Sequence, residues 1–284
     1  MIEISNIKET VKVIKQWKNQ GLTIGFVPTM GYLHDGHKSL IEKARLENDK
    51  VVVSIFVNPI QFGKNEDFDK YPKNIGGDLK MCSDAGVDLV FTPLAAEMYP
   101  AENLVYIDVN ELGDGLCGAS RIGHFRGVCT VVAKLFHIVT PDKAYFGEKD
   151  AQQLAIIKRM VYDLNFDIDI VPCPIVREQD GLAMSSRNMY LSKEERQAAL
   201  VISKSLELAK RSLADGLTSA EAIIGLIKTN ISNEPLAKIN YVEVVDANSL
   251  KPVNEIIAPV LVAVAVYIGE TRLIDNFLFD EVVK

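Results

Sequence analysis

Two of the chain's four histidines lie three residues apart in the sequence MGYLHDGH, between the apolar run TIGFVP and a polar–apolar pattern. If a helix begins near Asp35, His34 and His37 project from its first turn. That turn carries unpaired backbone N–H groups and partial positive charge, and a neutral imidazole adds one N–H donor. The pattern therefore indicates a phosphate-binding turn. A purely structural role stays open, whereas zinc is disfavoured because HxxH lacks the Glu of HExxH.

Two later segments combine charge with turn residues. In AYFGEKDAQQ, residues 144–153, Lys149 follows the end of an expected strand, where open parallel sheets bind ligands. In REQDGLAMSSRN, residues 177–188, two hydroxyls and the guanidinium of Arg187 suit a polyphosphate. Taken singly, an exposed strand–helix turn explains the first segment equally well, and an ordinary domain linker explains the second segment better.

Three further segments carry polar residues in loops next to the expected strands and helices. FVNPIQFG places Asn58 and Gln61 just after an apolar strand. Residues 64–78 are polar and contain Pro and Gly, so they form either a mobile lid or an ordinary surface loop. GASRIGHFRGV, residues 118–128, is either an anion-binding loop or a flexible connector.

The elements that must position these residues alternate along the first part of the chain. Apolar runs predict strands over 22–28, 50–59, 87–93, 103–109, 142–148 and 166–174. Helical spacing and stop signals predict helices over 8–21, 37–48, 78–86, 130–141 and 150–164. This alternation indicates an α/β fold: a Rossmann-like open parallel sheet with helices on both faces.

The pattern changes near residue 190. Ser192 with Glu195 three residues later predicts a capping box that opens a helix over 192–216, and a second helix follows over 218–231. The runs 239–246, 260–269 and 271–279 then predict an antiparallel set. We therefore expect a Rossmann-like domain over 1–176, a hinge loop over 177–188 and a smaller C-terminal α+β domain over 189–284.

Composition narrows the class of protein. The 284 residues are 48% hydrophobic and 24% charged, which is typical of a globular protein, and the net charge of −7 disfavours nonspecific nucleic-acid binding. The four cysteines are scattered without metal-site spacing. No signal-peptide pattern opens the chain, and the longest apolar stretch falls short of the roughly 18 residues that span a bilayer. We expect a cytoplasmic protein without membrane or nucleic-acid partners.

The joint order of the motifs points to a family. An HxGH turn followed much later by Met-Ser-Ser-Arg resembles the HIGH and KMSKS pair of the nucleotidylyltransferase superfamily. The segments VPTMGYLHDGH, SIFVNPIQF, HFRGV, YFGEKDAQQ and MSSRN appear in the order found in the pantothenate synthetase (pantoate–β-alanine ligase) family. This resemblance, over nearly the whole chain, implies condensation of pantoate with β-alanine by an ATP-dependent homodimer. The reaction passes through pantoyl adenylate and releases pyrophosphate and AMP.

The resemblance also implies roles for individual residues. His37 and His34, with Lys149 and Arg187, would be catalytic, and His37 would be the proton donor. Gln61 and Gln153 would bind pantoate, Gln61 would also bind β-alanine, and Asp78 would bind Mg²⁺. The implied ATP-binding residues are Met30, Gly31, His34, His37, Gly147, Glu148, Lys149, Asp150, Val176, Met184, Ser185, Ser186 and Arg187.

The sequence departs from the family pattern at two places. Asp35 stands where the family has Glu, which keeps the charge, and Gly76-Gly77 replaces more polar residues before Asp78, which weakens the metal assignment. Two other classes stay open. One is a nucleotidylyltransferase that leaves the nucleotidyl group on a phosphate acceptor. The other is a nonenzymatic binding module, against which the joint presence of the four catalytic residues argues.

Overall fold

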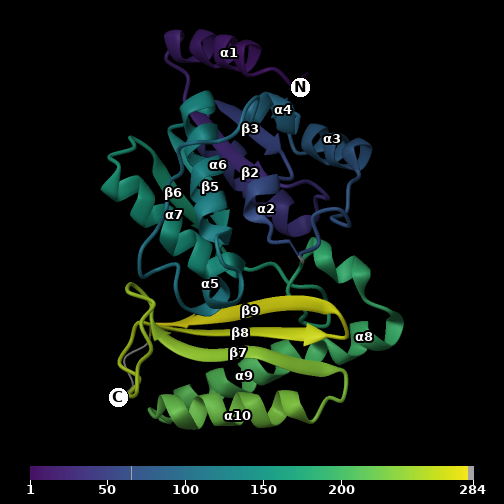
Figure 1. Cartoon of the computed structure of the whole chain (residues 1–284), viewed down its shortest axis with the longest axis vertical. Helices are drawn as coiled ribbons and strands as arrows, with labels where there is room; N and C mark the ends of the chain where they lie inside the picture. Colours follow the sequence, from purple (N-terminus) through teal and green to yellow (C-terminus); the bar gives the residue numbers. More distant parts are fainter. Residues whose placement is uncertain (65, 281–284) are drawn as a thin grey trace. The chain divides into compact units, whose positions relative to one another are not determined.

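A parallel sheet with the strand order β1-β4-β3-β2-β5-β6 carries the first half of the chain (Figure 1). The computed structural model describes residues 1–64 and 66–280, and it divides into two compact units. Unit 1 comprises residues 1–110, 120–148 and 153–174, and unit 2 comprises 111–119, 149–152 and 175–284. The two short segments in unit 2 fall within the range that the sequence assigned to the first domain, so the predicted boundaries stay a prediction.

All strand pairs in the sheet of unit 1 are parallel. The strands are β1 (Ile2–Ile4), β2 (Ile24–Thr29), β3 (Lys50–Ile55), β4 (Leu89–Phe91), β5 (Lys143–Gly147) and β6 (Asp169–Cys173). The chain runs from β2 outward to β3 on one side and later places β5 on the other side of β2. The carboxyl ends of β2 and β5 therefore flank the switch point where open α/β sheets bind ligands.

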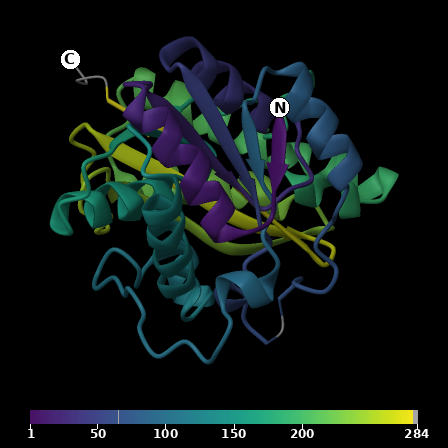
Figure 2. The same cartoon turned by 90° about the horizontal axis from the view of Figure 1, so that it is seen from above.

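Helices cover both faces of this sheet, as Figure 2 shows. On one face lie α2 (Asp35–Glu47) and α3 (Ile75–Asp84), packed over Val27, Val53 and Tyr145. On the other lie α1 (Ile7–Asn19) and α6 (His124–Val139), where Phe136 meets Phe26 edge to face. Burial on both faces explains why the central strands β2, β3, β4 and β5 are continuous apolar runs. The remaining helices in this part of the chain are α4 (Ala95–Met98), α5 (Leu116–Ser120) and α7 (Ala151–Asp163).

Two sequence predictions about strands were wrong. Residues 103–109 form no strand, because Leu104 and Val105 are exposed and the Ile107 amide donates to the Thr130 hydroxyl. The short strand β1 was missed because its residues look like the start of the amphipathic helix. The loop expected over 64–78 is shorter, since α3 begins at Ile75. Residue 65 lies outside the described residues, and a lid role stays a prediction.

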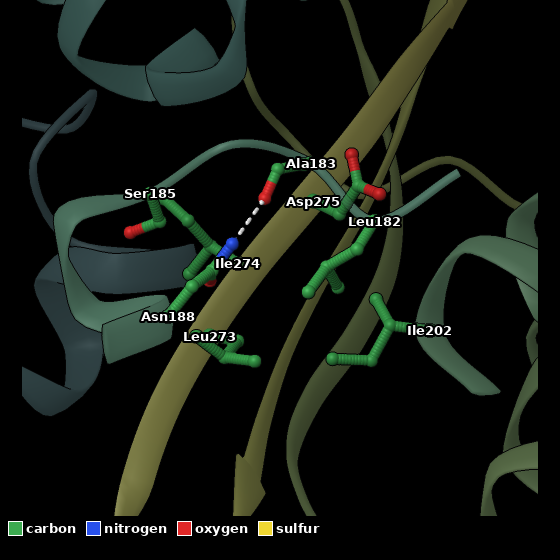
Figure 3. A pocket seen from close by; sticks show the side chains of 8 residues that line it. All are labelled: Leu182, Ala183, Ser185, Asn188, Ile202, Leu273, Ile274 and Asp275. Atoms are coloured by element: carbon green, nitrogen blue, oxygen red, sulfur yellow. Dashed lines mark hydrogen bonds between the residues drawn. The ribbon is translucent and has the colours of Figure 1, made fainter. Parts of the chain in front are cut away.

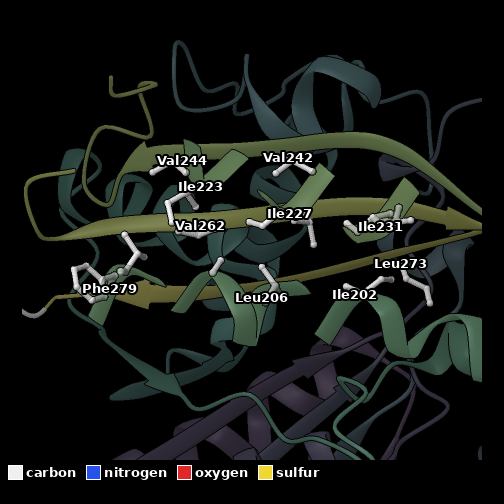
Figure 4. Close-up of a cluster of buried hydrophobic side chains, with 14 of the residues drawn as sticks. Ile202, Leu206, Ile223, Ile227, Ile231, Val242, Val244, Val262, Leu273 and Phe279 are labelled. Carbon is white, nitrogen blue, oxygen red and sulfur yellow. The ribbon is translucent and has the colours of Figure 1, made fainter. Parts of the chain in front are cut away.

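Unit 2 contains an antiparallel sheet in the order β7-β8-β9, as expected from its three apolar runs. These strands are β7 (Ala237–Asp246), β8 (Val260–Ile268) and β9 (Thr271–Phe279). The helices are α8 (Lys193–Ala198), α9 (Leu200–Ala214) and α10 (Ala220–Ser232). Figure 4 shows side chains of α9 and α10, including Leu206 and Ile227, against Val262 of the sheet. The Ser192–Glu195 capping box is confirmed, but the helix it opens is interrupted at Ala199.

Candidate active site

The HxGH turn joins β2 to α2. The Thr29 hydroxyl, at the end of β2, donates to the Ser54 carbonyl and accepts from the Gly31 amide. Gly31 and Tyr32 then adopt left-handed conformations, with φ of 86° and 52°. The helix begins at Asp35, two residues before the start of the range 37–48 that the sequence predicted, with His34 as its N-cap.

The two imidazoles form the cap of this helix. His34 Nδ1 accepts from the Gly36 amide at 3.2 Å, and His37 Nδ1 accepts from the His34 amide at 3.3 Å. The ring centroids lie 4.1 Å apart. Because each Nδ1 accepts a hydrogen bond from a backbone amide, the proton of each neutral ring lies on Nε2. The cap therefore makes Nε2–H the donor of both histidines.

Asp78 of α3 holds the same turn. Its Oδ2 accepts from the Tyr32 amide at 2.9 Å and its Oδ1 from the Leu33 amide at 2.7 Å. The side chain is 3% exposed. The residue that the family resemblance assigns to Mg²⁺ therefore contacts the backbone that leads into His34.

Gln61 lies in a 3-10 turn, η1 (Pro59–Gln61), directly after β3. Its Oε1 accepts from Asn58 Nδ2 at 2.9 Å, and its Nε2 donates to the Met30 sulfur at 3.1 Å. Asn58 also donates to the Gly127 carbonyl and accepts from the Tyr99 hydroxyl. Two residues assigned to different substrates, Met30 and Gln61, are thus neighbours.

The arginines of residues 118–128 already hold carboxylates. Arg121 donates twice to Glu66, and Arg126 pairs with Asp108. His124 donates from Nδ1 to the Gln61 carbonyl, and its Nε2 accepts from the Arg121 guanidinium. This segment therefore supports η1 and its neighbours instead of presenting an empty anion loop.

In unit 2, Lys149 lies in the 3-10 turn η2 (Glu148–Asp150) after β5. Its ammonium is 3.6 Å from the Asp150 carboxylate and its side chain is 18% exposed. Asn276 of β9 donates to the Lys149 carbonyl at 2.8 Å. Of the two glutamines that follow, Gln152 is buried and Gln153 is half-buried. The Gln152 side chain donates to the carbonyls of Leu112 and Gly115 and accepts from the Cys117 amide.

The Met-Ser-Ser-Arg segment leaves a tight hairpin. Met184 N donates to the Val176 carbonyl, so two residues assigned to ATP are paired. The segment then enters the 3-10 turn η3 (Ser186–Tyr190), which Ser185 caps by accepting from the Arg187 amide. On β9, Asp275 accepts two hydrogen bonds from Arg177 at the base of the hairpin.

A small pocket lies beneath this hairpin. Figure 3 shows the Asn188 amide bonded to the Ala183 carbonyl at its edge. The lining is mostly apolar and includes neither Met184 nor Arg187. We therefore interpret the pocket as a packing feature under the Met-Ser-Ser-Arg segment. The lining residues are Leu182, Ala183, Ser185, Asn188, Ile202, Leu273, Ile274 and Asp275.

Among the described residues, no cluster of three or more His, Cys, Asp or Glu side chains is arranged to hold a metal ion. None of the helices that these residues form is both long and apolar enough to cross a bilayer. Sequence reasoning missed Tyr99, Gln152 and Asn276, since their partners are far away in the chain.

Comparison with known proteins decides the family. The model of the pantoate-beta-alanine ligase family matches residues 3–278. The chain belongs to this family. The pantothenate synthetase of Clostridium acetobutylicum is 61% identical over 277 residues, which cover 98% of this chain and 99% of that protein. The pantothenate synthetase of Enterococcus faecalis is 58% identical, with 99% of each chain covered.

Solved structures agree with this membership. The crystal structure of pantothenate synthetase from Thermus thermophilus has a TM-score of 0.93 at 42% identity, covering 98% of this chain and 99% of that one. A pantoate-beta-alanine ligase from Francisella tularensis, complexed with beta-gamma ATP and beta-alanine, has a TM-score of 0.82 at 39% identity, covering 98% and 97%. As a pantoate-β-alanine ligase, the chain is an enzyme, and the predicted family and fold class are confirmed.

Proposed function

We propose that this ligase joins pantoate to β-alanine in two steps. In the first, a pantoate carboxylate oxygen attacks the α-phosphorus of ATP; a new P–O bond forms as the bond to pyrophosphate breaks. In the second, the β-alanine amine attacks the acyl carbon of pantoyl adenylate. The C–N bond forms, the C–O bond to AMP breaks, and the proton that the amine loses passes to solvent. The observation that carries this proposal is the imidazole-capped HxGH turn at the switch point of the sheet.

His34 and His37 act on the phosphates. Both hold a proton on Nε2 and sit at a helix N-terminus, so two N–H donors add to a positive dipole end. Donors fixed before the reaction stabilise charge that develops on phosphate oxygens. The neutral His37 ring would donate an Nε2–H hydrogen bond to the departing pyrophosphate. The proton-donor role that the family resemblance implies would require the imidazolium form, because a neutral ring that lost its one N–H proton would become an imidazolate.

The remaining ATP-binding assignments follow the family motifs. Lys149 and Arg187 neutralise phosphate charge. Neighbouring residues bind ATP through backbone and hydroxyl groups. They are Met30, Gly31, Gly147, Glu148, Asp150, Val176, Met184, Ser185 and Ser186. Support for Lys149 comes from its carbonyl, which Asn276 fixes, and from its largely buried side chain.

Gln61 and Gln153 bind pantoate, and Gln61 also approaches β-alanine. A carboxylate that attacks a polyphosphate must keep its nucleophilicity, and a neutral carboxamide withdraws less charge from it than an Arg does. The Gln61 amide is held by Asn58 and Met30, so its orientation is set before substrate arrives.

Magnesium enters this proposal as the partner of the ATP phosphates, where it supplies Lewis-acid neutralisation of their charge. Asp78 fits the role of its protein ligand poorly, because both carboxylate oxygens accept backbone amides. No step is therefore assigned to a metal held by this residue. A homodimer in the cytoplasm completes the proposal, on the family resemblance and on composition.

Nucleotide product analysis tests the function. The enzyme is incubated with ATP, Mg²⁺ and pantoate, with and without β-alanine, and with His37→Ala as a control for contaminating activity. We expect AMP and pyrophosphate to accumulate catalytically only when β-alanine is present, and only with the unaltered chain. ADP would point to an acyl-phosphate route, and a nucleotidyl group left on a phosphate acceptor would identify a nucleotidylyltransferase.

A further inference from the structure

We infer that Asp78 is a positioning residue that holds the HxGH turn in its phosphate-binding shape, and that it is not a magnesium ligand. The inference rests on the proposed function in one respect: it takes the turn to be the ATP phosphate site. Asp78 lies in the first turn of α3, and both of its oxygens bind the backbone of Tyr32 and Leu33. Leu33 directly precedes the N-cap His34, so the carboxylate fixes the chain at the entrance to the cap.

The turn needs such an acceptor. Tyr32 has φ of 52°, a left-handed conformation that is strained for a residue other than glycine. A backbone N–H that is removed from water without a partner adds a further cost in free energy. A carboxylate that accepts two amides offsets both costs, because hydrogen bonds to an ionised acceptor are about twice as strong as neutral ones.

The packing leaves the turn little freedom. A Cβ on Gly31 would lie 2.9 Å from Ile55 Cγ2 and 3.1 Å from Asp78 Oδ2. Gly31 is also left-handed, with φ of 86°. The carboxylate thus sits directly against the turn, and a change at Asp78 is transmitted to the first residues of α2 and to both imidazole caps.

The surroundings of Asp78 do not resemble a magnesium site. Mg²⁺ requires near-octahedral coordination by oxygen atoms. The residues before Asp78 are Gly76 and Gly77, and one helical turn later stands Met81, so none of the three offers a side-chain oxygen. The side chain is buried, and the described residues contain no cluster of three metal-binding side chains.

The test compares Asp78→Asn with Asp84→Asn, an exposed change on the same helix where the carboxylate pairs with Lys80. Asn retains the shape of Asp78 but turns one acceptor into a donor facing a backbone amide. We expect Asp78→Asn to lower the single-turnover rate of adenylate formation by roughly 10- to 100-fold. The Mg²⁺ concentration that gives half the maximal rate should stay unchanged, and Asp84→Asn should change neither quantity.

A spectroscopic readout reports the turn directly. In ¹⁵N NMR spectra, Nδ1 of His34 and His37 should appear unprotonated in the unaltered protein, and Asp78→Asn should shift these signals. A merely destabilising substitution in a folded sample would leave the imidazole tautomers as they are. An unchanged rate with unchanged imidazole signals would contradict the positioning role.

The metal alternative makes the opposite prediction. If Asp78 binds Mg²⁺, Asp78→Asn should raise the half-saturating Mg²⁺ concentration, and high Mg²⁺ should restore the rate. Should the variant fail to fold, amide hydrogen exchange of the unaltered protein decides the question. Tyr32 and Leu33 should stay protected when Mg²⁺ and a nonhydrolysable ATP analogue are added, and loss of protection would overturn the inference. Failure of the proposed function would instead appear in the nucleotide products of the unaltered enzyme.

Discussion

At the scale of single residues, the Gln61 amide shows how a binding group is oriented. Asn58 donates to two acceptors, Gln61 Oε1 and the Gly127 carbonyl, so its own oxygen must face Tyr99. Burial raises the pKa of Tyr99, which therefore keeps its proton and donates. The network leaves Gln61 with its NH₂ toward Met30, as a donor for substrate oxygens.

Asn58→Asp should disrupt this orientation. The substitution replaces the Asn58 amide nitrogen with a carboxylate oxygen, which then faces Gln61 Oε1 and the Gly127 carbonyl. Rotation of the Gln61 amide relieves the repulsion with Oε1 but turns its NH₂ group away from Met30. Loss of one oriented hydrogen bond to a charged substrate should raise the KM for pantoate about tenfold, whereas the KM for ATP stays near its original value. Tyr99→Phe removes one supporting bond and should have a smaller effect. An unchanged KM for pantoate in Asn58→Asp would show that the network does not orient Gln61.

Gln153→Arg separates binding from nucleophilicity. The added guanidinium should keep or improve the affinity for pantoate, because it attracts the carboxylate. It should slow adenylate formation, since a strongly neutralised carboxylate attacks phosphorus less readily. Single-turnover rates at saturating pantoate measure the effect, with Gln153→Glu as the oppositely charged comparison. An undiminished rate in Gln153→Arg would refute the argument from charge.

At the scale of elements, α6 and η1 approach each other so closely that only glycine fits at Gly127. A Cβ there would lie 2.5 Å from both Gln61 Cα and the Ile60 carbonyl oxygen. Gly127→Ala should therefore lower the free energy of unfolding by about 1–3 kcal/mol and raise the KM for pantoate. Gly225→Ala, in the middle of α10, is the matched control. A Cβ at this position would have no atom within 4 Å, so the substitution should raise the free energy of unfolding by about 1 kcal/mol. Equal stability of the two variants would contradict this account.

The elements themselves were largely predictable because their signals are local. Strands buried on both faces read as apolar runs, and Ser192 with Glu195 marked a helix start within four residues. The prediction of a strand over 103–109 was wrong because it, too, rested on a local signal. An apolar run does not show whether a neighbouring strand exists to pair with it. Among the residues that the structure describes, the short β1 pairs with β4, 87 residues away in the register Ile2 to Leu89, which no local pattern reveals.

The supports of the candidate site were not predictable in this way. The histidine turn is contiguous, so its chemistry is visible in eight letters of sequence. Its support by Asp78 joins residues 46 positions apart, and the bond from Asn276 to Lys149 spans 127. Hydrogen bonds of that separation depend on the completed fold. The family resemblance identified Asp78 as important but assigned it to metal, whereas its contacts are to backbone.

At the scale of the whole molecule, acid sensitivity should come from a few partly buried, paired carboxylates of unit 1. Asp88 precedes β4 and accepts from Arg45, Lys50 and the Val51 amide, joining α2 to the sheet. Burial opposes its ionisation, but these donors outweigh burial and hold the pKa of Asp88 below its ordinary value of 3.8. Glu66 behaves alike: burial raises its pKa, the two bonds from Arg121 lower it, and the result is a lowered pKa.

Asp88→Asn tests this at the level of stability. A carboxylate with a lowered pKa in the folded state stabilises the fold above its unfolded pKa, and that stabilisation is lost as pH falls through the folded pKa. At pH 7 the substitution should cost about 2 kcal/mol, because Arg45 and Lys50 lose their anion. The difference from the unaltered chain should shrink once the pH falls below the ordinary value of 3.8. Urea unfolding followed by the single tryptophan, Trp17, measures it, since Lys50 lies 5.4 Å from that ring. The control is Asp163→Asn, which breaks an exposed pair with Arg159 and should change the free energy of unfolding very little, both at pH 7 and below pH 3.8. If Asp88→Asn lowered the free energy of unfolding equally at both pH values, packing and not charge would make Asp88 stabilising.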